Sequence, residues 1–90
     1  MTPQKIKLPA EERKQLATAL KKIIGQMNAV LELVEKNEVT DSTFNQLLAV
    51  KGGITRVCKE IIAKGVLPNL RNYTDKQIDN ALNIIFRLDR

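Results

Sequence analysis

The sequence predicts an all-α protein in which a long antiparallel helical hairpin is followed by a shorter third helix. Apolar residues recur at three- and four-residue steps along most of the 90 residues, and no segment carries a competing strand pattern. Aromatic residues make up 3% of the chain against 43% hydrophobic residues, so the core must be aliphatic. We expect one domain over residues 1–90, with residues 1–8 as a flexible N-terminal arm.

The first helix is expected to begin at Pro9 and to end near Lys36. Pro9 is followed by Glu11 and Glu12, and this order suits a helix N-terminus, where the helix dipole favours negative charge. The apolar seam of this helix consists of Leu16, Leu20, Ile23, Met27, Val30 and Val34. Its alternating four- and three-residue steps are typical of a long helix that packs lengthwise against another.

The second helix is expected after a tight turn over residues 36–41, with Thr40 or Asp41 as its N-cap. Its wide apolar face consists of Phe44, Leu47, Leu48, Ile54, Val57, Cys58, Ile61 and Ile62. Gly65 stands where a C-terminal cap glycine is expected, and Pro68 follows it. Because the turn is short, the first two helices should pack as antiparallel neighbours.

The third helix is expected to open at Thr74, because Gln77 follows three residues later at the spacing of a capping box. Its apolar stripe consists of Ile78, Ala81, Leu82, Ile85 and Leu88. A chain of this size cannot cover the stripes of all three helices by itself. We therefore expect a homo-oligomer, either a dimer or a tetramer.

Charge is segregated along the chain, whose formal net charge is +5. Residues 1–24 carry six Lys or Arg against two acids, residues 25–50 carry one against four, and residues 51–71 carry five against one. Antiparallel packing brings both basic stretches to the same end, which favours a polyanionic partner. The same pattern also fits a solvated surface, a protein partner or an anionic membrane. The residues expected to contact the phosphates or grooves of double-stranded DNA are Lys14, Lys21, Lys22, Arg56 and Lys59.

Several function classes lack the residues that they require. The chain has no histidine and one cysteine, which excludes an internal disulfide and a Cys/His nucleophile pair and predicts no metal site within one chain. No glycine-rich phosphate loop or other cofactor motif is present, so we expect neither a cofactor nor an enzyme. No apolar run approaches the roughly 20 residues of a membrane span. We expect a cytoplasmic protein without a membrane partner.

Two glycines and the cysteine fall inside the second predicted helix. Each glycine in a helix interior costs about 1 kcal/mol relative to alanine, so Gly52 and Gly53 need a compensating role. Close packing against a neighbouring helix is the favoured interpretation, and a hinge is the alternative. Cys58 lies on the apolar side, which favours a core position over a redox or electrophile sensor.

Two segments, LKKIIGQMNAVLELVEKN and FNQLLAVKGGITRVCKEIIAKGVLPNL, carry a family resemblance. The chain resembles the small helical repressors that sense copper, nickel or cobalt, and formaldehyde (the CsoR/RcnR/FrmR family). The resemblance implies that two protomers form an antiparallel four-helix bundle, that dimers pair into a tetramer, and that an inducer releases operator DNA. Arg56 matches a family position implicated in DNA binding, whereas a second such position falls near Ala19.

The sensor positions of the family are substituted in this chain. The resemblance aligns the sensing cysteine with Thr40, a histidine with Gly65 and the further cysteine of the copper sensors with Asn69. These residues cannot supply the soft ligands that Cu(I) prefers. The sequence therefore predicts a DNA-binding repressor that is not gated by the usual metal site. The alternative is a helical interaction module that has lost operator binding.

Overall fold

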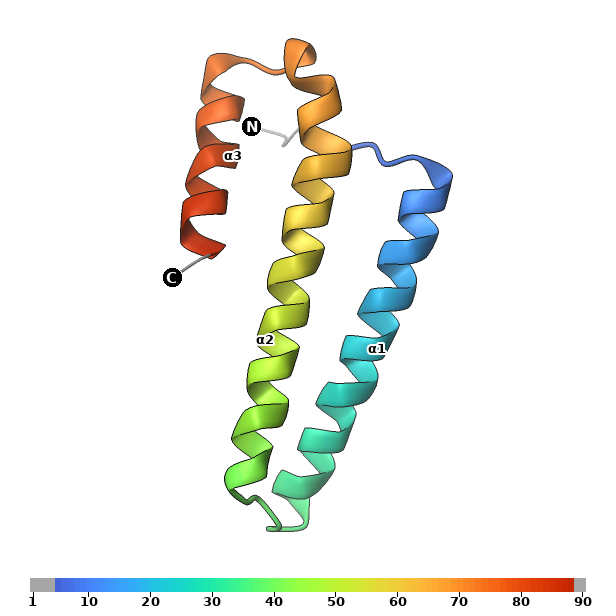
Figure 1. Cartoon of the computed structure of the whole chain (residues 1–90), viewed down its shortest axis with the longest axis vertical. Helices are drawn as coiled ribbons and strands as arrows, with labels where there is room; N and C mark the ends of the chain where they lie inside the picture. Colours follow the sequence, from blue (N-terminus) through green and yellow to red (C-terminus); the bar gives the residue numbers. More distant parts are fainter. Residues whose placement is uncertain (1–4, 89–90) are drawn as a thin grey trace.

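The computed structural model describes residues 5–88 and consists of three helices with irregular helical turns between the last two (Figure 1). The α-helices are α1 (Ala10–Glu35), α2 (Asp41–Ile61) and α3 (Asp75–Leu88). Helices α1 and α2 lie side by side and antiparallel, and α3 lies against α2 on the side away from α1. The described residues contain no strand, so the predicted all-α fold is confirmed.

Helix α1 begins and ends as the sequence predicted. Its N-cap is Pro9, whose carbonyl oxygen accepts the backbone N–H of Arg13 at 2.9 Å. At the other end Asn37 takes the left-handed conformation, with φ 57°. The N–H of Glu38 donates to the carbonyl of Leu33 at 2.8 Å, and that of Asn37 donates to Val34 at 3.1 Å. This pair of bonds is a Schellman motif, which turns the chain back into α2.

Helix α2 is capped by Thr40, as expected. The backbone N–H of Thr40 donates to Oγ1 of Thr43 at 3.0 Å. The Thr43 side chain is only 2% exposed, so this hydrogen bond satisfies a buried hydroxyl. Thr74 and Gln77 form the predicted capping box of α3, with bonds of 2.8 Å and 3.2 Å.

The prediction that Gly65 caps the C-terminus of α2 is wrong. No described glycine has a positive φ, and Gly65 lies within a π-helical turn over Ile62–Val66. A 3-10 helix over Leu67–Asn72 follows, and the Asn69 side-chain amide donates to the Gly65 carbonyl at 2.9 Å. The helix therefore changes its winding at this point instead of ending.

Gly65 is a glycine because the N-terminal segment packs directly on it. A Cβ atom at Gly65 would overlap Cγ2 of Ile6 and would lie 3.0 Å from Cδ2 of Leu8. Leu8 also packs on the core. Residues 1–4 of the predicted N-terminal arm lie outside the described residues.

The core between α1 and α2 is small and aliphatic. It is formed by Leu16, Ile23, Val50 and Val57, with Ala19 and Ile61 at its edge. A Cβ atom at Gly53 would lie 3.1 Å from Cδ1 of Ile23, so close packing is confirmed for this glycine. A Cβ atom at Gly52 would meet nothing within 4 Å, so close packing within the protomer does not explain Gly52.

Candidate nucleic-acid interface

The α1–α2 hairpin has two different faces, set by the position of each residue relative to the core. Ile24 follows core residue Ile23 by one position, and Cys58 follows core residue Val57 by one. Because the helices are antiparallel, residues that follow core positions lie on one side of the hairpin, and residues that precede them lie on the other.

The first side carries exposed apolar residues, which we call the apolar face. It consists of Leu20, Ile24, Met27, Leu31 and Val34 of α1 with Leu47 and Ile54 of α2, all at least 38% exposed. Half of the predicted seam of α1 therefore packs on α2, while the other half is uncovered within one protomer. An exposed apolar stripe along both helices is typical of a protein interaction surface.

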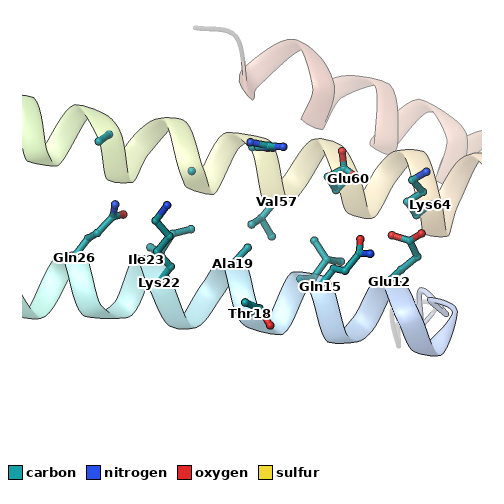
Figure 2. Close-up of a pocket in the computed structure, with 14 residues that line it drawn as sticks. Glu12, Gln15, Thr18, Ala19, Lys22, Ile23, Gln26, Val57, Glu60 and Lys64 are labelled. Carbon is teal, nitrogen blue, oxygen red and sulfur yellow. The ribbon is translucent and has the colours of Figure 1, made fainter.

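The second side contains a groove of about 630 Å³, which we call the polar groove (Figure 2). Its floor is formed by Leu16, Ala19, Ile23, Ala49, Gly53 and Val57. Its polar lining consists of Glu12, Gln15, Thr18, Lys22, Gln26, Arg56, Glu60 and Lys64. Figure 2 shows Lys22, Gln26 and Gln15 extending from α1 toward α2.

The structure divides the five predicted DNA-contacting residues between the polar groove and the outer surface. Lys22 and Arg56 both line the groove. Lys14, Lys21 and Lys59 are exposed but do not line it, since each lies two positions from a core residue and so points away from the partner helix.

Sequence reasoning missed the other polar residues of the groove. Gln15, Gln26, Glu60 and Lys64 were not singled out, although Gln15 precedes core residue Leu16 by one position. Gln15 could have been predicted from its position next to Leu16 in the apolar seam of the first helix. Antiparallel helices bring together the side chains that flank such a seam. Glu12, Glu60 and Lys64 lie toward one end of the groove, and Lys22 and Gln26 lie toward the other (Figure 2).

The fold and this surface define a small all-α protein with an uncovered apolar face and a polar, partly recessed opposite face, whose lining carries three cations and two carboxylates. Residues 12–87 match the model of the family described as metal-sensitive transcriptional repressor. The chain belongs to this family, which confirms the resemblance inferred from the sequence, and the family is one of transcriptional repressors and not a class of enzymes. The chain matches no curated protein and no solved structure.

The three residues that the resemblance aligns with the family's sensor positions do not offer the ligands that a transition metal prefers. Thr40 caps α2, Gly65 has no side chain, and the Asn69 amide donates to the Gly65 carbonyl. None of them offers the thiolate or imidazole that such ions favour. Among residues 5–88 no group of three or more His, Cys, Asp or Glu could hold a metal ion. The one thiol, that of Cys58, is half-buried and not in a disulfide.

Within residues 5–88 no helix is both long and apolar enough to cross a bilayer.

Proposed function

We propose that the protein is a repressor that binds double-stranded operator DNA through the basic side of the α1–α2 hairpin. The observation that carries this proposal is that Lys22 and Arg56, from different helices, line the same side of the hairpin. Lys14 and Lys21 extend the positive charge over the exposed surface of α1. Cations spread over one end of an elongated surface suit the regularly spaced phosphates of a duplex. A DNA partner implies a cytoplasmic location.

A second copy of the chain is the proposed occupant of the apolar face. Two hairpins that join through these faces form a four-helix bundle and bury apolar side chains such as Leu31 and Val34, which are more than half exposed in one protomer. The polar grooves then lie on the two outer sides of the dimer. Pairing of dimers into a tetramer would repeat the basic surface again and increase the number of phosphates that it neutralises.

Release from DNA is not proposed to follow the family's usual metal chemistry. The residues aligned with the sensor positions have structural roles at the two ends of α2. Thr40 is the N-cap, and the Asn69 side-chain amide donates to the Gly65 carbonyl after the helix ends. Helix α2 has 21 residues and is therefore about 30 Å long, which separates these positions widely within a protomer.

The test is binding to the duplex upstream of the protein's own coding sequence, measured by fluorescence anisotropy over a series of salt concentrations. Each phosphate that the protein neutralises contributes about 0.9 to the slope of log affinity against log salt. We expect Arg56→Ala to weaken binding and to flatten this slope by about that amount for each phosphate that Arg56 neutralises in the wild-type complex. Lys76→Ala is the matched control, because Lys76 is an exposed cation on α3 outside the groove.

An unchanged slope in a folded Arg56→Ala oligomer would place the DNA surface elsewhere.

The second candidate function is an interaction module without operator binding, which the exposed Leu82, Ile84 and Phe86 of α3 favour. Absence of any salt-sensitive duplex binding by the wild-type protein would support that candidate instead.

A further inference from the structure

The polar groove is recessed because its floor is built from small residues. Ala19, Ala49 and Gly53 lie where the apolar side carries Leu20, Leu47 and Ile54. A Cβ atom at Gly53 would lie 3.1 Å from Ile23, so the backbone of α2 itself forms part of the floor. The hollow therefore lies on the side of the hairpin that carries these small residues.

Three cations, Lys22, Arg56 and Lys64, border this hollow, and all three are exposed and make no hydrogen bond or ion pair with residues 5–88. Lys64 lies toward the end that carries Glu12 and Glu60, whereas Lys22 lies toward the other end (Figure 2). Gln26 is half-buried and extends toward α2 beside Lys22 (Figure 2). Glu60 follows Arg56 by one helical turn, and its carboxylate opposes an anion at that end of the groove.

The shape and lining of the hollow suit a ligand that has both an anionic group and an apolar body, and a DNA backbone has no apolar body. A volume of about 630 Å³ lies within the range of small-molecule sites, which combine an apolar lining with a few polar groups. A duplex phosphate can reach the cations at the rim, but it has no apolar body to cover Ala19, Ile23 and Val57 on the floor. A carboxylate with a flat apolar body matches both parts, because a guanidinium can bind a carboxylate through two parallel hydrogen bonds.

We propose that the polar groove binds small organic acids, with the carboxylate held between Lys22 and Arg56 and the apolar body on the floor between α1 and α2. A second step rests on the proposed function of DNA binding. A bound acid neutralises the cations that would otherwise contact operator phosphates, and so it releases the DNA. By linkage, operator DNA weakens binding of the acid by the same factor.

The site is tested without DNA, by titrating the ¹⁵N-labelled protein with benzoate at constant ionic strength and following amide chemical shifts. Benzamide is the control ligand, since it has the same shape without the charge. We expect saturable benzoate shifts at the Gly53 amide and the Gln26 side chain. Loss of the charged hydrogen bonds in Arg56→Gln should weaken benzoate binding about tenfold, and Glu60→Gln should strengthen it. Equal binding of benzamide, or shifts confined to other parts of the chain, would overturn the site.

The regulatory step is tested separately, by adding benzoate or benzamide to the protein–duplex complex at fixed ionic strength. Release by benzoate alone supports the step, and unchanged duplex affinity at saturating benzoate overturns it. If the wild-type protein binds no duplex, the proposed DNA function fails, while the benzoate titration still decides the site.

Discussion

The two faces of the α1–α2 hairpin differ in where their residues stand relative to the core positions. One face is formed by residues just before core residues in the sequence, and the other by residues just after them. Gln15 and Lys22 precede core residues and line the polar groove, whereas Ile24 and Leu31 follow buried residues and lie on the apolar face. Over the same length of helix, cations border the polar groove on one side, and large aliphatic side chains are exposed on the apolar face on the other. The apolar face is the one proposed to meet a second copy of the chain, and the polar groove is the one proposed to meet an anion.

The largest effect is expected from placing a charge on the apolar face. Leu31→Glu would bury a carboxylate without a partner between two protomers, and we expect it to weaken self-association by more than about a hundredfold, equivalent to about 3 kcal/mol. Sedimentation velocity measures the oligomer. Leu48→Glu is the control, because Leu48 is 62% exposed but lies outside this face. A wild-type protein that sediments as a folded 10.1 kDa monomer would contradict the pairing of apolar faces.

A smaller effect is expected at Gly65, where the N-terminal segment closes the end of the hairpin. In Gly65→Ala the new methyl group must displace Ile6 and Leu8, so we expect a loss of about 1–3 kcal/mol in the free energy of unfolding, measured in urea. Shortening Ile6 to alanine in the same chain should recover part of this loss. If the two substitutions are simply additive, the contact between residues 6 and 65 is not the cause.

The smallest effect distinguishes Gly52 from Gly53. Gly52→Ala has open space around it and should raise the free energy of unfolding by up to about 1 kcal/mol, because alanine favours the helix. Gly53→Ala should gain clearly less, since its methyl group would press on Ile23 from 3.1 Å. Thermal and urea unfolding of the two variants measure the difference. Equal gains would show that the floor of the polar groove is not tightly packed.

Local sequence patterns determined the three helices of this protein, the residues at which they start and the turn between the first two. The capping residues Thr40 and Thr74, the start at Pro9 and the antiparallel turn follow from hydrogen bonds and backbone preferences within a few residues, so a single sequence carries them. The order of short motifs over residues 12–87 determined the family as well. The absence of histidine and the single cysteine determined which ligands the sensor positions cannot offer.

Only the tertiary structure decided what depends on residues distant in the chain. Gly65 has the sequence context of a helix cap, yet its lack of a side chain serves a contact with Ile6 and Leu8, more than fifty residues away. Arg56 and Lys59 are three residues apart, yet Arg56 alone of the two lines the polar groove, because the partner helix selects which flank of α2 is recessed. Helical periodicity places residues around one axis, whereas a groove or a close contact exists only once a second segment has packed beside it.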